Sequence, residues 1–591
     1  MIRIKFSAMK KFSSRTPPIA AFFLAALLLA TILSGCNQEQ ATRSTGGQAC
    51  NISTTSIASV QGSRSESDMV GEVVTVRGIT TLIDPGKGIY IEEPGSDDNE
   101  RTSNAMFIEV TGFGNAIQPG VQVQVEGTVA ELKKGRNSLT ALVNTPGLQV
   151  CGDDRKLPLT PIQLPLQGLD REALEAMRVS LPDTLTITDN YRFNNGQIGV
   201  SGNGLQYIAT ELMPPGAKTN KYARENQTFT LPIQLQQIDA DAQSFSAGAQ
   251  IDHIIGVMTH DDRELRLSVA TAVKPMSVSA HMLTAPIPKA AANASRVVGM
   301  NLYNYFNGDG HGGDFPTPRG AKTVADFEKQ RQRIGAALHA MQPQLVAVME
   351  LENDGFGPDS ATADFVALLN QKAGGVWLAV RPENDNTGSD AIRVGLFYRS
   401  DLWQTQESAR TLSGPEFNRS RQPQAQLLRP VGGGESLLLV VNHLKSKGSC
   451  PDSGPDADQK DGQGCWSAMR TVSAQKMTAW VKSLAATSQT DNILIMGDMN
   501  AYRREAPVDA IRTAGFEELM DSAEGQPFSF MYYGQAGTLD YAFVSPALKQ
   551  KVQNAFIWQV NSSMPAQMDL QIPWLRFSDH DPVVVDLSLR H

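Results

Sequence analysis

Polar side chains that could bind a divalent cation and move a proton follow apolar runs in the second half of the chain. Asp498 and Asn500 come directly after one such run, and Asp540 and then Asp579-His580 each stand beside another. Carboxylate and amide oxygens are the ligands that hard cations prefer, and an imidazole is a suitable base near neutral pH. This order of groups predicts metal-assisted attack of water on a phosphodiester.

Three further polar groups end apolar runs upstream: Asn301, Glu350 and His443. Glu350 is predicted to be the main metal ligand, because a carboxylate beside an apolar core needs a cationic partner. Glu352 is the alternative ligand. His443 is a second imidazole, expected to protonate the leaving oxygen.

Taken in this order, the fragments around these residues resemble the endonuclease/exonuclease/phosphatase superfamily, the fold of pancreatic-type deoxyribonucleases. Within it they look most like bacterial secreted endonucleases of the ExeM/NucH type. The resemblance spans about residues 296–589 and implies a four-layer α/β sandwich of two sheets with outer helices. One residue departs from the family pattern, because Met349 stands where a glutamine usually precedes the glutamate.

The resemblance also implies a role for each group. The ligands of Mg²⁺, or alternatively Mn²⁺, would be Glu350, Asp498, Asp579 and Asn301. The general base would be His580, oriented by Asp540, and the general acid would be His443. Asp498 would also position the attacking water. The substrate phosphate would be held by Asn301, Arg393 and Asn500.

The overall charge is unfavourable for a protein that approaches a polyanion. Lys and Arg number 52 against 61 for Asp and Glu, which gives a formal net charge of −9. Local groups of cations must then attract the phosphates of the substrate. The cations near the motifs are Lys445, Lys447, Arg470, Arg503 and Arg504. They are expected to form a basic patch, with solvated surface charges as the alternative.

The N-terminal segment has the pattern of an export signal. Basic residues precede an apolar run at 19–33 that is too short to span a bilayer, which predicts a secretory signal peptide over residues 1–35. Met1 and Met9 are both candidate starts. Leu33-Ser34-Gly35-Cys36 resembles a bacterial lipobox, which implies a diacylglycerol anchor on Cys36 and, with Asn37 following, an outer-membrane lipoprotein. An ordinary cleaved signal with a free Cys36 is the alternative.

Four cysteines remain after Cys36, an even number that suits disulfides in an oxidising compartment. Pairing by locality predicts Cys50–Cys151 and Cys450–Cys465, and the other two pairings stay open. The loop between Cys450 and Cys465 is rich in Asp and Gly. It is interpreted as a solvated loop, with a structural Ca²⁺ site as the alternative.

Composition divides the rest of the chain into modules. Residues 36–50 form a flexible tether, and residues 51–152 alternate apolar and polar residues over about five strands. This pattern suits a small Greek-key barrel and resembles the OB-fold modules that precede secreted nucleases. Residues 157–285 form a second β-rich module, so one or two small OB-like β-barrel modules are expected ahead of the C-terminal domain. Residues 295–591 alternate strand and helix, as in α/β layers.

These observations favour a lipid-anchored, extracytoplasmic, metal-dependent endonuclease that hydrolyses phosphodiester bonds of DNA, with RNA as an alternative substrate. A sphingomyelinase or inositol-phosphate phosphatase of the same superfamily is one alternative. A non-catalytic surface lipoprotein that binds nucleic acid or glycans is another. No protein partner is inferred.

Overall fold

The computed structural model describes residue 50 and residues 52–590, with gaps at 96, 98, 114–115, 134–137, 154, 167–170, 239–240, 262–264, 277–286, 522–525 and 567–569. The predicted signal peptide, Cys36 and the tether up to residue 49 lie outside the described residues. In the part of the chain so described, no helix combines the length and apolar character that crossing a membrane requires.

The first β-rich region is a closed five-stranded barrel. Its strands follow the order β1-β2-β3-β5-β4, and β4 pairs back with β1 to close the ring. β3 and β5 run parallel and the other pairs antiparallel. The elements are α1 (Ile57–Gln61), β1 (Val73–Asp84), β2 (Gly88–Glu92), β3 (Ala105–Glu109), β4 (Gln122–Glu131), β5 (Thr140–Val143) and β6 (Leu148–Gly152), which pairs with β4.

The second β-rich region is one eight-stranded sheet of order β13-β9-β10-β12-β15-β14-β8-β7. Its edges β13 and β7 are not paired with each other among the described strands, so this sheet is open and is not a second barrel. Its strands are β7 (Thr160–Pro161), β8 (Arg178–Leu181), β9 (Leu185–Asp189), β10 (Gln197–Ser201), β12 (Thr230–Leu235), β13 (Gln250–Ile251), β14 (Ile254–His260) and β15 (Leu265–Val269). The short elements β11 (Gln206–Tyr207), α2 (Ala209–Leu212) and α3 (Ala217–Thr228) lie between β10 and β12 in the sequence.

The two β-rich regions share an apolar core. Leu82, Tyr90 and Phe107 of the barrel pack in one cluster with Val179 and Leu267 of the open sheet. The barrel interior is a separate apolar cluster. Such a shared core fixes one region against the other, because separating them would expose its apolar surface to water.

The C-terminal region contains two larger sheets. The first has the order β18 (Trp377–Ala379), β19 (Ile392–Arg399), β17 (Leu345–Glu352), β16 (Ser295–Tyr305), β30 (Val583–Leu587), β29 (Val552–Ile557). The second has the order β20 (Trp403–Thr405), β22 (Gln424–Pro430), β23 (Leu437–His443), β24 (Ile493–Asp498), β28 (Asp540–Val544), β25 (Glu517–Glu518), and β21 (Arg410–Thr411) pairs with β22. Both sheets mix parallel and antiparallel pairs, as expected of an α/β domain.

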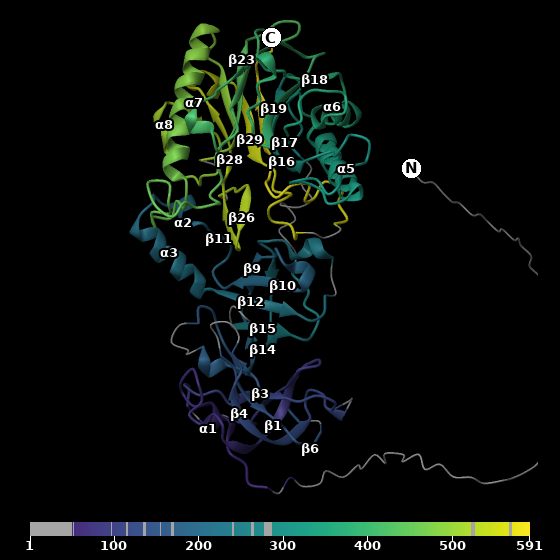
Figure 1. Cartoon of the computed structure of the whole chain (residues 1–591), viewed down its shortest axis with the longest axis vertical. Helices are drawn as coiled ribbons and strands as arrows, with labels where there is room; N and C mark the ends of the chain where they lie inside the picture. Colours follow the sequence, from purple (N-terminus) through teal and green to yellow (C-terminus); the bar gives the residue numbers. More distant parts are fainter. Residues whose placement is uncertain are drawn as a thin grey trace, which may run out of the picture. The chain divides into compact units, whose positions relative to one another are not determined.

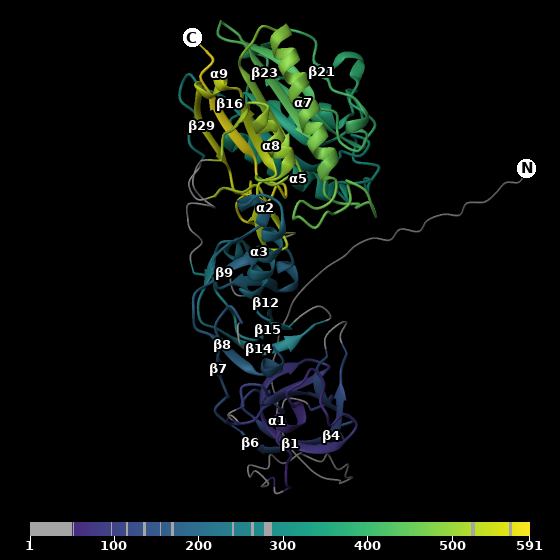
Figure 2. The same ribbon diagram turned by 90° about the vertical axis from the view of Figure 1, so that its left-hand side faces the viewer.

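Three apolar clusters hold these sheets and their helices together. One lies between the sheets and joins Val297, Ala347 and Leu396 of the first to Leu439 and Leu494 of the second. The helices are α5 (Val324–Met341), α6 (Ala361–Lys372), α7 (Ser467–Thr487), α8 (Ala506–Thr513) and α9 (Pro546–Lys549). The second cluster packs α5 and α6 on the first sheet, and the third packs α7 and α8 on the second. Figure 1 shows these helix pairs on opposite sides of the strands, and Figure 2 shows α7 running along its sheet.

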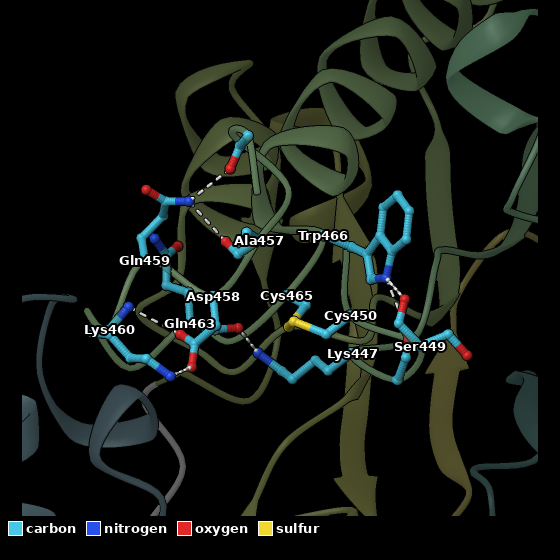
Figure 3. The surroundings of a disulfide bond; sticks show 12 residues. Lys447, Ser449, Cys450, Ala457, Asp458, Gln459, Lys460, Gln463, Cys465 and Trp466 are labelled. Atoms are coloured by element: carbon cyan, nitrogen blue, oxygen red, sulfur yellow. Dashed lines mark hydrogen bonds and ion pairs between the residues drawn. A yellow bond between two sulfur atoms is a disulfide. The ribbon is translucent and has the colours of Figure 1, made fainter. Parts of the chain in front are cut away.

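Both predicted disulfides are present, Cys50–Cys151 and Cys450–Cys465. Figure 3 shows the second, which closes the loop that precedes α7. Within this loop Asp458 pairs with Lys460 at 2.9 Å, and Asp461 accepts hydrogen bonds from the backbone and side chain of Gln463. These two carboxylates are therefore satisfied by their own neighbours.

Candidate active site

Three of the predicted residues form one row across the second large sheet. β23 ends at His443, β24 ends at Asp498, and β28 begins at Asp540. His443 lies opposite Asp498, and Asp498 lies opposite Asp540 in the strand register. Paired residues on neighbouring strands project to the same face, so the row gathers an imidazole and two carboxylates at one sheet edge. His443 Nε2 lies 3.4 Å from Asp498 Oδ2.

His580 and Asp540 form a buried pair, with Nδ1 of the imidazole 2.7 Å from Oδ2 of the carboxylate. Ser529 orients this carboxylate, because its hydroxyl donates to Asp540 Oδ2 at 2.8 Å and accepts from the Asp540 backbone N–H at 3.0 Å. Burial alone would lower the pKa of His580, but Asp540 and Asp579 outweigh it and hold that pKa well above its usual range. The pair therefore leaves Nε2 as the nitrogen free to exchange a proton with a substrate or water.

The segment that carries His580 is fixed by Asp581, which the sequence analysis did not single out. Its Oδ1 accepts backbone hydrogen bonds from Val560 at 2.8 Å and Asn561 at 2.6 Å, and Ser562 Oγ donates to its Oδ2. Asn561 Nδ2 in turn donates to the His580 carbonyl at 2.6 Å. These bonds fix the backbone of His580, so Asp581 and Asn561 position the imidazole without contacting it.

The first large sheet contributes Glu350 through an irregularity between β16 and β17. The β16–β17 register shifts between Asn301 and Tyr305, and the β17–β19 register shifts between Val348 and Leu351. Glu350 lies at this irregularity and has a positive φ of 62°. Such irregularities redirect side chains at functional sites. The carboxylate is held by the backbone N–H of Asn304, 3.0 Å from Glu350 Oε2. Burial raises the pKa of Glu350, and the charge of Asp579 raises it further.

The two sheets meet at these groups. Burial raises the pKa of Asp498 to about 7, and Asp540 and Glu350 add to that rise while His580 opposes it. Glu350 belongs to the first large sheet and Asp540 to the second, and the charges of both raise the pKa of Asp498. Asn301 lies on β16 opposite Met349 of β17, and its Oδ1 accepts a hydrogen bond from the Tyr303 backbone at 2.8 Å.

Asn500 follows Asp498 in a tight turn with a φ of 48°. Its backbone N–H donates to Asp498 Oδ1 at 2.7 Å, and its Nδ2 donates to the Leu444 carbonyl at 3.0 Å. Asn500 therefore ties the end of β24 to the residue that follows His443. Its predicted contact with phosphate stays a prediction.

Arg393 is placed apart from this row. Its guanidinium donates to the Val394 carbonyl at 3.1 Å and to Thr362 Oγ1, and it lies 4.6 Å from the centroid of the Phe356 ring. Burial lowers its pKa to about 10. None of these partners is His443, Asp498 or Asp540.

Arg421 faces the row instead. It is 8% exposed, and its Nε lies 3.5 Å from Asp390 Oδ2. Burial lowers the pKa of Arg421, and the negative charges of Asp390, Glu350 and Asp498 oppose this shift by raising it. Burial also lowers the pKa of His443 well below its usual range, and Arg421 adds to that shift. No apolar run flanks Arg421 in the sequence, so the strand-end pattern could not identify it.

The predicted basic patch is mostly engaged in structural pairs. Lys447 binds Glu505 at 2.6 Å, Arg503 binds Glu211 at 2.9 Å, and Arg504 binds Asp521 at 2.9 Å. Arg470 donates to backbone carbonyls. Lys445 lies over the Trp466 ring at 5.2 Å, and burial lowers its pKa to about 8 with help from Arg421, Arg470 and Arg419. Arg421 and Arg319 are the guanidinium groups that act on His443.

The residues at the row fit a divalent cation. Ligand atoms of Asp498, Asp540 and His580 all lie within 4.8 Å of one another, and all three residues are buried. Asp540 Oδ1 is buried and has no hydrogen-bond partner among the described residues. A bound cation would give this oxygen the partner that buried polar atoms normally have. The group differs from the predicted ligand set, which joins Asp498 to Glu350, Asp579 and Asn301. The observed group offers buried carboxylate oxygens that carry negative charge. Such oxygens are the ligands that hard cations prefer.

The comparisons with known proteins agree with the C-terminal fold. Residues 305–580 match the model of the Endonuclease/Exonuclease/phosphatase family, so this segment is a domain of that family. Members of this family are hydrolytic phosphoesterases, nucleases or phosphatases, that typically use divalent metals. No curated protein matches the sequence.

Solved structures similar to the chain cover about half of it. An endonuclease/exonuclease/phosphatase from Bacteroides vulgatus is 16% identical, covers 50% of this chain and 99% of its own, and has a TM-score of 0.35. The human Nocturnin catalytic domain with bound sulfate is 16% identical, with coverages of 51% and 96% and a TM-score of 0.34. D. rerio TDP2 complexed with single-strand DNA product is 13% identical, with coverages of 50% and 98% and a TM-score of 0.32.

Proposed function

We propose that this chain, whose residues 305–580 are a phosphoesterase domain of the endonuclease/exonuclease/phosphatase family, is a metal-dependent endonuclease that hydrolyses phosphodiester bonds of DNA. RNA is the alternative substrate. The observation that carries the proposal is the buried Asp540–His580 pair beside the carboxylates of Asp498, Glu350 and Asp579. A base next to a cation site is what the attack of water on a phosphodiester requires.

In this proposal each side chain has a distinct task. Asp540 keeps the Nδ1 hydrogen of His580 in place, so that Nε2 accepts a proton from the attacking water. His443 Nε2 lies 3.4 Å from Asp498 Oδ2, and His443 is the proposed general acid, which would give a proton to the leaving oxygen.

A divalent cation bound by Asp498 and Asp540, with Glu350 and Asp579 nearby, would stabilise the charge that develops on the phosphate. Mg²⁺ is the proposed ion and Mn²⁺ the alternative. Arg421 and Lys445 would attract the substrate backbone locally, in spite of the net charge of −9. Arg393 would act from outside the row, by supporting the fold near Thr362.

The placement of the protein is part of the same proposal. A secretory signal over residues 1–35 and a lipid on Cys36 would hold it at the outer membrane, facing away from the cytoplasm. The two disulfides suit an oxidising compartment. The barrel order β1-β2-β3-β5-β4-β1 supports an OB-like fold for the first module, and the three apolar clusters support a four-layer sandwich for the last.

The test is hydrolysis by the purified chain. Plasmid DNA, RNA, sphingomyelin and an inositol phosphate are each incubated with MgCl₂ or with EDTA. Nicking of the plasmid that needs metal and is lost in His580→Ala supports the endonuclease. His339→Ala is the matched control, because His339 is an exposed imidazole on α5. Hydrolysis of sphingomyelin or of the inositol phosphate with intact plasmid would instead support the sphingomyelinase or the inositol-phosphate phosphatase. No hydrolysis at all would favour a non-catalytic lipoprotein that binds nucleic acid or glycans.

The anchor has its own test. Cys36→Ser should move the protein from the membrane fraction to the soluble fraction of the cell envelope. An unchanged distribution would refute lipid anchoring through Cys36.

A further inference from the structure

A row of aromatic rings leads outward from the catalytic histidine. The Phe530 ring packs on the His580 ring with centroids 4.6 Å apart. Tyr532 follows on the same strand face, nearly parallel to Phe530 with an interplanar angle of 20° and centroids 6.5 Å apart. Tyr533 contacts Tyr532 edge to face at 4.6 Å. Tyr532 is 54% exposed and Tyr533 is 77% exposed, so the row begins at the buried base and ends in solvent.

The row is displayed by a tight hairpin with an unusual residue at its tip. β26 (Phe530–Tyr532) pairs with β27 (Gln535–Gly537), and Tyr532 lies opposite Gln535. The two loop residues, Tyr533 and Gly534, both have positive φ, 46° and 73°. Asparagine, aspartate and glycine are the residues that suit such a turn, and a bulky side chain there is uncommon. An exposed tyrosine at the tip therefore has no advantage for folding.

The hairpin is anchored to the second β-rich region. β11 pairs with β27 in parallel, with Gln206 opposite Gln535 and Tyr207 opposite Ala536. Gly534 lies against Asp189, where an added Cβ would come within 3.1 Å of the Asp189 Cβ. This anchorage gives the exposed rings of Tyr532 and Tyr533 a fixed direction.

Two further exposed tyrosines lie near the same site. Tyr191 is 64% exposed and comes two residues after Asp189, the residue that supports the hairpin. Tyr303 is 53% exposed, and it follows Asn301 at the irregular end of β16. Burial raises the pKa of Tyr303, and Asp579 and Tyr191 are both close enough to raise it further. We call Tyr191, Tyr303, Tyr532 and Tyr533 the aromatic rim.

We propose that the aromatic rim stacks on unpaired nucleobases of a nucleic acid strand whose phosphodiester lies at His580, so that the preferred substrate is single-stranded or locally unpaired. This inference rests on the proposed function. Exposed aromatic rings bind single strands because every base offers a π-face to stack on. In a duplex those faces are covered by neighbouring bases, and exposing one costs unstacking energy.

The chemistry of the rim favours this occupant over a protein or a membrane. All four members are tyrosines rather than aliphatic residues, and the row is continuous with the catalytic base through Phe530. Any ligand on Tyr532 is therefore adjacent to the scissile bond. Stacking also supplies affinity that does not depend on charge, which matters in a chain whose net charge is −9.

The test compares strands with and without bases, using the full chain with MgCl₂. The substrates are a single-stranded oligonucleotide, the same sequence as a duplex, and an abasic strand of the same length. Wild type should cleave the single strand with the highest kcat/KM. Tyr532→Ala with Tyr533→Ala should lower kcat/KM on the single strand about 5-fold to 150-fold per ring, mainly through KM. The abasic strand should be unaffected by these substitutions, and Tyr532→Phe with Tyr533→Phe should retain activity.

A second variant separates stacking from folding. Tyr533→Asn places a residue at the turn that tolerates a positive φ, so thermal stability should be equal or higher while single-strand affinity falls. Equal cleavage of single and double strands by wild type and by the alanine variant would overturn the proposal and leave the endonuclease intact.

Binding without chemistry distinguishes failure of the rim from failure of the proposed function. In EDTA, fluorescence anisotropy with the labelled single strand should show weaker binding for the alanine variant. If the wild type cleaves nothing but this difference remains, the rim proposal stands without the nuclease. If the substitutions instead change self-association, or binding to anionic phospholipid vesicles, and leave strand binding unchanged, the rim is a protein or membrane contact and the proposal is wrong.

Discussion

Glu211 lies on α2 in the second β-rich region, yet it binds two segments that carry catalytic residues. Its Oε1 accepts from Arg503 Nε at 2.9 Å and from Thr538 Oγ1 at 3.0 Å, and its Oε2 accepts from the Thr538 backbone at 2.9 Å. Arg503 follows Asn500 by three residues, and Thr538 precedes Asp540 by two. Glu211→Ala should therefore both destabilise the protein and disturb the active site.

The expected size follows from burial. The side chains of Glu211 and Arg503 are 4% and 7% exposed. Removing one partner of a buried pair costs about 3–5 kcal/mol, because the other charge is left uncompensated. Arg503 keeps Glu518 at 2.9 Å, which places the expected loss near the lower limit, about 3 kcal/mol. Glu211→Gln keeps the shape and loses the charge, so it should cost about 1.5–3 kcal/mol.

The assay is urea unfolding followed by tryptophan fluorescence, together with kcat on the preferred substrate. Glu225→Ala is the matched control, because Glu225 pairs with Lys221 at 3.5 Å on the neighbouring helix with both side chains exposed. An exposed pair of this kind should change stability by less than about 1 kcal/mol. The reasoning is refuted if Glu211→Ala matches Glu225→Ala in both readouts. A fall in stability with unchanged kcat would mean that Glu211 supports the interface and does not position the site.

Three other outcomes are expected. Asp540→Asn should lower kcat about 10²-fold to 10⁴-fold, because the base loses its orienting carboxylate, while the melting temperature stays close to wild type; retained activity would contradict the assigned pair. EDTA should abolish hydrolysis and added MgCl₂ should restore it and raise the melting temperature, because a cation that binds only the folded chain stabilises it; a melting temperature insensitive to the ion would argue against the site. Burial raises the pKa of Glu92 from 4.5 to about 7, so Glu92 holds a proton in the folded chain that the unfolded chain releases between these values. The contribution of Glu92 to the free energy of unfolding should therefore fall by about 3 kcal/mol as pH rises from 4.5 to 7. Glu92→Gln should reduce the loss of stability between pH 5 and pH 8 by that share, and the exposed Glu109→Gln should leave it unchanged, as measured by urea unfolding.

Much of the site was predictable because its polar groups end buried strands. An apolar run that stops at a carboxylate or imidazole marks both the strand and its functional end. Parallel pairing of β23 and β24 then brings His443 and Asp498 together without any further information. The closed barrel followed from period-two alternation, and the disulfides followed from locality.

The contacts that orient the site were not predictable in the same way. Ser529, Arg421 and Glu211 lie in loops or short elements with no periodic pattern around them. Their partners are distant in sequence, as with Glu211 and Thr538, which lie 327 residues apart. Arg393 is a different case: its guanidinium contacts Thr362 and Phe356, and its predicted contact with phosphate stays a prediction. Only the three-dimensional fold decides which cation meets the carboxylates.

The second β-rich region contacts three chain segments that lie near Asn500, Asp540 and His580 in the sequence. Glu211 holds the segment after Asn500 and the segment before Asp540. Asn190 Nδ2 donates to the Ser563 carbonyl at 2.8 Å, in the stretch that leads to His580. A catalytic group must keep its geometry to within a fraction of an ångström, and loops do this poorly unless other elements support them. The functional unit therefore extends beyond the matched segment 305–580, because the residues that immobilise its catalytic loops lie upstream of it.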